Sequence, residues 1–164
     1  VFTLKYFADI INYLKFDKVV VLDPHSSVSE AVFDNLTVKS PQKYIENVIN
    51  KVYRLTNNTE LMIFYPDEGA MKRYVDMNGV PYTFGIKRRE WRTGKILGLD
   101  VCGNTDEIKG KNILIIDDIS SRGGTFYHSA KKLKELGASG VLLLGNEVRA
   151  SFGDRCESIY NLLK

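Results

Sequence analysis

The sequence predicts an α/β protein in which a parallel sheet of about five strands is covered by helices on both faces. Short unbroken apolar runs occupy residues 19–22, 61–64, 113–116 and 141–144, and residues 80–86 form a further strand-like segment. Such runs are typical of strands that are buried on both faces of a parallel sheet. Apolar residues at helical spacing lie between them, for example at 44–52 and 126–136. Strands that alternate with helices indicate parallel pairing through right-handed crossovers.

Composition and charge exclude several classes of protein. The chain has 164 residues, of which 44% are hydrophobic and 26% charged, as in an ordinary globular domain. Its net charge of +3 gives no reason to expect a nucleic-acid partner. No apolar run approaches about 20 residues, so we expect no membrane partner. Two cysteines without metal-site spacing indicate reduced thiols and a cytoplasmic protein.

Neither end of the sequence resembles a natural boundary. Val1 is followed almost at once by a helical pattern, and residues 159–164 stop inside another one. We therefore expect residues 1–164 to form a single domain that is a fragment of a longer protein.

Residues 112–125 are the most informative stretch of the sequence. An apolar strand is followed by Asp117 and Asp118, by a turn closed with Gly123, Gly124 and Thr125, and by a helical pattern. Ligands of open α/β sheets bind beyond the carboxyl ends of strands, often against the N-terminus of a helix. The glycines allow backbone N–H groups to surround a phosphate, and the two carboxylates suit sugar hydroxyls or a hydrated divalent metal. A Walker A loop and a dinucleotide fingerprint are both absent from the sequence.

Polar residues also follow two other predicted strands. Asp23, Pro24 and His25 come after residues 18–22, and residues 65–70 combine two acids with a glycine after the strand at 61–64. Carboxyl ends of parallel strands share one edge of a sheet, so we expect the turns at 23–26, 65–70 and 117–125 to converge.

Residues 87–95 form the only dense basic run of the chain. They include Lys87, Arg88, Arg89, Arg92 and Lys95, with Gly94 near the end. A solvated loop and a loop that folds over anionic phosphates both account for this run, and the neighbouring turns favour the second. Residues 96–112 are interpreted as a connecting segment that includes a hairpin.

Four separated segments resemble the C-terminal half of ribose-phosphate pyrophosphokinases, the phosphoribosyl pyrophosphate (PRPP) synthetases. These segments are residues 3–25, 65–73, 87–89 and 117–125, and their order and spacing agree with that family. The resemblance implies a type I phosphoribosyltransferase-like three-layer fold with a flexible hood loop. It also implies a preceding half of similar fold that supplies much of the adenine pocket, and homo-oligomers of the full-length protein.

The resemblance implies a reaction in which ATP gives its β,γ-diphosphoryl group to the 1-hydroxyl of ribose 5-phosphate. The products are PRPP and AMP, and Mg²⁺ is the cofactor. His25 and Asp67 match positions that hold the metal. Lys87 and Arg89 match the catalytic cations, which stabilise charge on the transferred group. Matches to the diphosphate turn are Asp67, Glu68, Gly69 and Ala70, and matches to the ribose-phosphate loop are Asp117, Asp118, Ser121, Arg122, Gly123, Gly124 and Thr125.

The sequence departs from the family pattern at three positions. The usual ribose loop reads Asp-Asp-x-x-Asp-Thr-x-Gly-Thr, whereas this chain has Ser121 and Arg122 in place of the third Asp and the Thr. Ala70 replaces the second glycine of the diphosphate turn. Two alternatives stay open: a PRPP-dependent phosphoribosyltransferase of nucleotide metabolism, which would use the same ribose loop, and a non-catalytic PRPP synthetase-like regulator, which the altered loop motivates.

Overall fold

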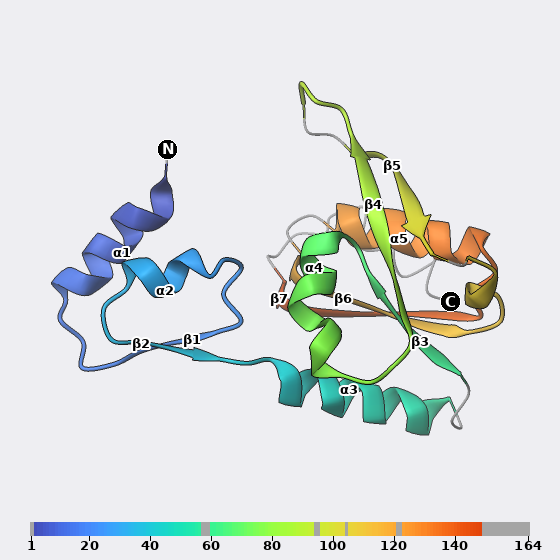
Figure 1. The fold of residues 1–164 in the computed structure, drawn as a ribbon, viewed down its shortest axis with the longest axis horizontal. Coiled ribbons are helices and arrows are strands. Elements are labelled where there is room, and N and C mark those ends of the chain that lie inside the picture. The colour runs from blue at the N-terminus through green and yellow to red at the C-terminus, as the bar shows by residue number, and fades with distance from the viewer. Residues whose placement is uncertain (1, 57–59, 94–95, 104, 121–122, 149–164) are drawn as a thin grey trace. The chain divides into compact units, whose positions relative to one another are not determined.

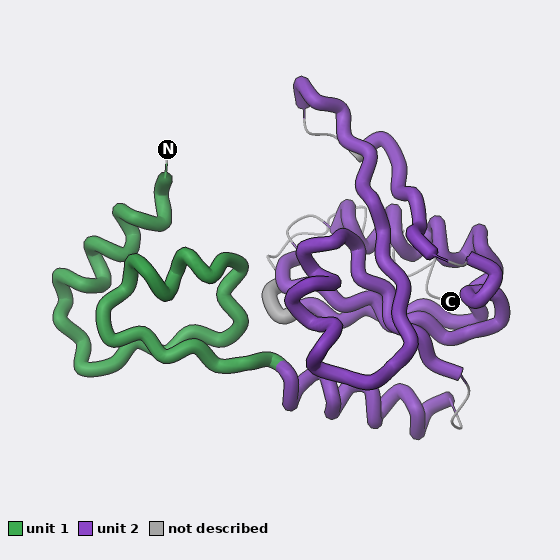
Figure 2. The backbone as a smooth tube through the Cα atoms, in the orientation of Figure 1, with its two compact units in different colours: residues 1–41 green, residues 42–164 purple. Residues whose placement is uncertain are grey.

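The computed structural model of the protein describes residues 2–56, 60–93, 96–103, 105–120 and 123–148. The chain divides into two compact units, residues 1–41 and 42–164, which are described separately below (Figure 2). The expectation of a single domain that is part of a longer protein stays a prediction. Among the described residues, no helix has the length and apolar character needed to cross a membrane.

Unit 1 (residues 1–41) contains two helices and a two-stranded parallel sheet. Its elements are α1 (Thr3–Tyr13), β1 (Val19–Leu22), α2 (Val28–Val32) and β2 (Leu36–Lys39). β1 pairs with β2 from Val19 opposite Leu36 to Leu22 opposite Lys39. The Asn12 side chain joins α1 to the end of α2, because it donates to Val32 O and accepts from Asp34 N, each at 2.9 Å.

Unit 2 (residues 42–164) contains the main sheet (Figure 1). Its elements are α3 (Gln42–Leu55), β3 (Leu61–Tyr65), α4 (Glu68–Tyr74), a 3₁₀ turn η1 (Val75–Met77), β4 (Tyr82–Arg89), β5 (Ile96–Cys102), a second 3₁₀ turn η2 (Thr105–Ile108), β6 (Asn112–Ser120), α5 (Gly124–Glu135) and β7 (Gly140–Val148). The strand order is β5-β4-β3-β6-β7. All neighbours are parallel except β4 and β5, which pair antiparallel. The predicted α/β fold with a parallel sheet of about five strands is confirmed. Two strands differ from the prediction: residues 19–22 belong to the separate sheet of unit 1, and β5, which was expected in a connecting segment, is an antiparallel edge strand.

Helices cover both faces of this sheet, as the sequence predicts. β3 is buried along its whole length, and its side chains alternate between the two faces. Met62 and Phe64 pack with α5 in one apolar cluster, whereas Leu61, Ile63 and Tyr65 pack with α3 and α4 in another. The unbroken apolar run therefore reflects burial on two sides.

Three details of the structure differ from the sequence-based expectations. The basic run does not begin in a loop, because Lys87, Arg88 and Arg89 belong to β4 and pair with β5. β6 continues past the apolar run to Ser120, since its last residues pair with β7. Tyr44 fits the helical spacing of the core residues in α3, but its side chain is exposed.

Gly85 permits close packing between β4 and the chain that follows β3. A Cβ atom at this position would lie 2.8 Å from Leu99 Cδ1, 3.0 Å from Phe64 Cζ and 3.0 Å from the backbone oxygen of Pro66. We therefore expect Gly85→Ala to lower the free energy of unfolding by about 1–3 kcal/mol, measured by urea denaturation. Gly79→Ala is the matched control, because a Cβ there meets no atom within 4 Å. Equal stability of the two variants would contradict this account of Gly85.

Candidate active site

The strand order reverses between β3 and β6. From β3 the chain continues to β4 on one side, and it later returns to β6 on the other side of β3, followed outward by β7. β3 ends at Tyr65, and its pairing with β6 ends where Phe64 lies opposite Ile115. Beyond Ile115, β6 pairs only with β7 among the described strands. Such a reversal point, at the carboxyl ends of the strands, is where open α/β sheets bind ligands.

Asp67 and Lys87 meet at this edge of the sheet. Asp67 caps α4, because its Oδ1 accepts a hydrogen bond from the Ala70 amide at 3.0 Å. Its Oδ2 lies 2.6 Å from Lys87 Nζ, and the lysine side chain is only 10% exposed. Burial alone would raise the pKa of Asp67, but the hydrogen bonds from Lys87 and from backbone amides outweigh it and hold this pKa below its usual value. Asp67 is therefore ionised and Lys87 is its counter-ion.

The charges of Asp67 and Lys87 also act on Asp117. Burial raises the pKa of Asp117 to about 7; the positive charge of Lys87 opposes the rise, and the negative charges of Asp118 and Asp67 add to it. The Asp117 carboxylate also accepts a hydrogen bond from the Asp118 amide at 3.0 Å. Asp67 and Asp117 thus act on each other electrostatically, although they are fifty residues apart in the chain.

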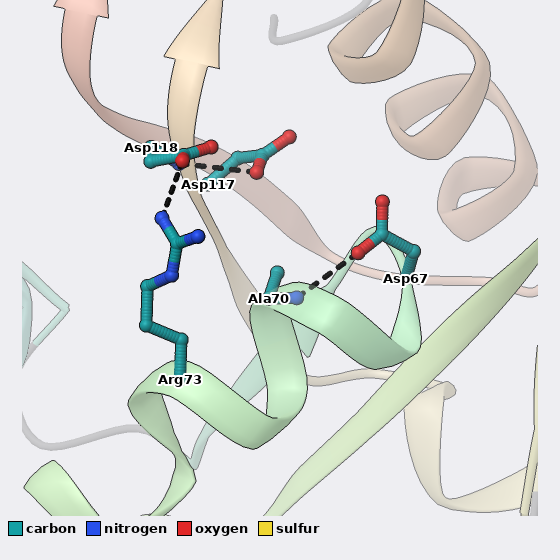
Figure 3. Close-up of polar contacts among 5 residues, drawn as sticks. All are labelled: Asp67, Ala70, Arg73, Asp117 and Asp118. Atoms are coloured by element: carbon teal, nitrogen blue, oxygen red, sulfur yellow. Dashed lines mark hydrogen bonds and ion pairs between the residues drawn. The ribbon is translucent and has the colours of Figure 1, made fainter. Parts of the chain in front are cut away.

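Asp118 points to the other face of β6 and pairs with Arg73 of α4 (Figure 3). Successive residues of a strand face opposite sides of a sheet, so two adjacent acids cannot share one environment. The ion pair joins Arg73 Nη1 to Asp118 Oδ2, and the Asp118 side chain is 9% exposed. A carboxylate that is buried to this degree needs a partner of opposite charge.

The N-terminus of α5 follows the end of β6. Gly123 precedes this helix with a φ of 68°, in the left-handed region that favours glycine. The helix begins at Gly124, and Tyr127 N donates to Gly123 O at 2.8 Å. The first N–H groups of any helix have no partner within the helix and attract anions, which suits the predicted phosphate-binding role of Gly123, Gly124 and Thr125.

Hydrogen bonds and charge interactions bring together Asp67, Ala70, Lys87 and Asp117. Asp118 follows Asp117 in the chain but contacts Arg73 on the other face of β6. A Cβ at Gly69 would approach Asp67 Oδ1 to 3.2 Å, so a small residue suits that position. Glu68 instead pairs with Lys72 in solvent, at 2.7 Å. Arg89 is exposed at the end of β4, after a shift in the strand register.

Three of the predicted site residues are not placed relative to these contacts. His25 belongs to unit 1, so its convergence with Asp67 stays a prediction. The preceding Asp23 has a φ of 46°, an unusual conformation that aspartate tolerates better than most residues. Ser121 and Arg122 lie outside the described residues.

Arg73 belongs to the segment 65–73 that resembles the diphosphate turn of the family, but its contact with Asp118 was not predicted from the sequence. Its partner, Asp118, is 45 residues away, and such a pair appears only when α4 packs beside β6. One local signal was available: Arg73 follows Ala70 by three residues and therefore lies on the same side of α4 as this buried residue.

Comparisons with known proteins agree with this geometry. The chain is 32% identical over 136 residues to the ribose-phosphate pyrophosphokinase of Pyrococcus abyssi, which covers 80% of the chain and 44% of that protein. It is 30% identical over 145 residues to the enzyme of the same name from Mycoplasma genitalium, covering 87% of the chain and 42% of that protein. The crystal structure of phosphoribosylpyrophosphate synthetase from Mycobacterium smegmatis superposes with a TM-score of 0.71 at 26% identity, over 89% of this chain and 46% of that one. No protein-family model matches the chain.

The fold and the acids at its strand ends define a domain of the type I phosphoribosyltransferase-like class. The chain spans slightly less than half the length of the curated relatives that it matches. Within that span it is a PRPP synthetase-like domain, homologous to the C-terminal half of ribose-phosphate pyrophosphokinases. The resemblance inferred from the four segments is thereby confirmed.

Proposed function

We propose that this chain carries the ribose 5-phosphate site, and part of the phosphoryl-transfer site, of a ribose-phosphate diphosphokinase. The sugar 1-hydroxyl oxygen attacks the β-phosphorus of ATP and loses its proton, while the bond from that phosphorus to the α-phosphate oxygen breaks. The products are PRPP and AMP. The observation that carries the proposal is the meeting of Asp67, Lys87 and Asp117 at the reversal point of the sheet, with Asp118 next to Asp117 on the other face of β6.

Each residue has a role that its environment supports. Asp117 and Asp118 accept hydrogen bonds from the ribose hydroxyls, and the N-terminus of α5 binds the 5-phosphate. Lys87, which is nearly buried, stabilises negative charge on the diphosphoryl group during transfer. The turn of residues 67–70, next to Lys87, contacts the diphosphate. Arg89 approaches the same phosphates from the end of β4.

The residues of the proposed site suit a Mg²⁺ ion that would be bound jointly by protein carboxylates and by substrate phosphates. Among the described residues, no group of three or more histidine, cysteine or acidic side chains can hold a metal alone. Mg²⁺ is usually held by one or two carboxylates together with substrate phosphates and water, and the neighbouring Asp67 and Asp117 provide such carboxylates. Bound there, the cation would neutralise charge on the diphosphoryl group. A contribution from His25, a cytoplasmic location, and homo-oligomers of the full-length protein stay predictions.

Calorimetric titration with ribose 5-phosphate and Mg²⁺ tests the proposal. We expect saturable binding by the chain and a loss of at least about 10-fold in affinity in Asp118→Ala, because the sugar hydroxyls lose a charged acceptor. Ribose without a phosphate is the control ligand and should bind much more weakly. A folded sample that shows no heat with ribose 5-phosphate would contradict the proposal. Release of diphosphate from PRPP on addition of a base would instead support a phosphoribosyltransferase.

A further inference from the structure

Arg73 lies in the last turn of α4, and its side chain extends to Asp118 of the candidate site (Figure 3). Its guanidinium pairs with Asp118, one of the two acids proposed to bind the sugar. The two side chains are 25% and 9% exposed, so the pair is largely shielded from solvent. The resemblance of residues 65–73 to the diphosphate turn includes Arg73, but neither it nor the comparisons give this residue a role at the sugar.

A second ion pair on α4, between Lys72 and Glu68, is far more exposed than the pair of Arg73 and Asp118. Lys72 pairs with Glu68 at 2.7 Å, with side chains that are 69% and 63% exposed. Exposed pairs of this type contribute little to stability and hold no fixed geometry. The Arg73 pair, in contrast, joins a guanidinium to a carboxylate that is only 9% exposed, and a shielded pair of this kind has a more fixed geometry than an exposed one.

α4 also connects Asp118 to the diphosphate turn. Its first turn is held by the Asp67 cap on the Ala70 amide. Ala70 and Tyr74 are buried against the sheet, which fixes the helix along its length. One short helix therefore bears the diphosphate turn at its beginning and the partner of the sugar acid at its end.

We propose that Arg73 is a positioning residue of the sugar site. By holding the Asp118 carboxylate, it sets the orientation in which this acid accepts hydrogen bonds from the ribose hydroxyls. Through α4, it also keeps that acid at a constant distance from the diphosphate turn. This inference rests on the proposed function, because it assumes that Asp118 contacts a sugar.

Calorimetry on Arg73→Met and Arg73→Lys tests this role. We expect Arg73→Met to weaken binding of ribose 5-phosphate about 10-fold, since a misplaced acceptor loses its hydrogen bonds to the hydroxyls. Arg73→Lys keeps the charge but loses the planar guanidinium, so we expect an intermediate loss. Lys72→Met removes the same charge from the neighbouring position and should change the affinity by less than about 2-fold. Circular dichroism verifies folding, and Arg73→Lys provides the answer if Arg73→Met does not fold.

A double variant separates positioning from a merely structural role. If Arg73 acts through Asp118, then Arg73→Met combined with Asp118→Asn should bind no more weakly than Asp118→Asn alone. Wild-type affinity in folded Arg73→Met, or losses that add in the double variant, would overturn the inference and leave the proposed function intact. Absence of binding by the wild-type chain would overturn both.

Discussion

Replacing Lys87 with methionine in the full-length protein, of which this chain is expected to be a part, should slow the formation of AMP from ATP and ribose 5-phosphate by about 10²–10³-fold. The Lys87 ammonium is nearly buried and lies 2.6 Å from Asp67, beside the turn proposed to bind diphosphate. A preorganised cation in such a site stabilises charge that develops on the transferred group, and methionine preserves the apolar part of the side chain only. Because the proposed ribose 5-phosphate site consists mainly of other residues, the affinity for this sugar should change little.

The measurement is the rate of AMP release, with calorimetric binding of ribose 5-phosphate as the test of folding. Lys111→Met is the matched control, because Lys111 is also partly buried, at 22% exposure, and pairs with Glu60 at 3.1 Å. Glu60 precedes β3, at the end of that strand opposite to Asp67. A Lys87→Met variant that releases AMP at the wild-type rate would remove Lys87 from the mechanism.

Replacing Asp117 with asparagine is expected to stabilise the protein above neutral pH. The pKa of Asp117 rises from 3.8 to about 7, so the folded state binds more protons than the unfolded state between these values. Stability due to the protonated carboxyl is complete below about pH 4 and is lost as the pH rises through 7. The cost of ionisation is at most about 4 kcal/mol, and we expect about half of it because Asp117 is only partly buried.

Urea denaturation at pH 5 and pH 8 measures this effect. The wild-type chain should lose stability relative to Asp117→Asn between the two values, and the two proteins should converge at the lower pH. Asp100→Asn is the control, because Asp100 pairs with Arg88 in solvent and should respond weakly at both values. An Asp117→Asn variant without a stability gain at pH 8 would show that Asp117 is already ionised at low cost.

The buried part of the fold could be predicted from sequence because one physical cause dominates there. β3 and the first residues of β6 are continuous apolar runs, and only burial on both faces explains such runs in a chain of this composition. The acids that follow these strands were expected at one edge of the sheet. The ion pair of Asp67 with Lys87 and the electrostatic interaction of Asp67 with Asp117 agree with that expectation.

The strand ends were less predictable, because backbone pairing determines them. Lys87, Arg88 and Arg89 at the end of β4 form a strand because their backbone pairs with that of β5. Backbone hydrogen bonds of this kind depend little on the side chains. β6 reaches Ser120 for the same reason, through β7. The ion pair between Arg73 and Asp118 depends on the packing of α4 beside β6, which periodicity within either element does not reveal.

The most direct test of the central claim is an NMR titration of the ¹⁵N-labelled chain with ribose 5-phosphate and Mg²⁺. If the carboxyl ends of β3, β4 and β6 form one binding site, the largest amide shift changes should occur at residues 67–70, 87, 117–118 and 123–125. The N-terminal residues of β3 and β6, which pair at the opposite edge of the sheet, should change little. Changes confined to that opposite edge, or no changes in a folded sample, would contradict the claim.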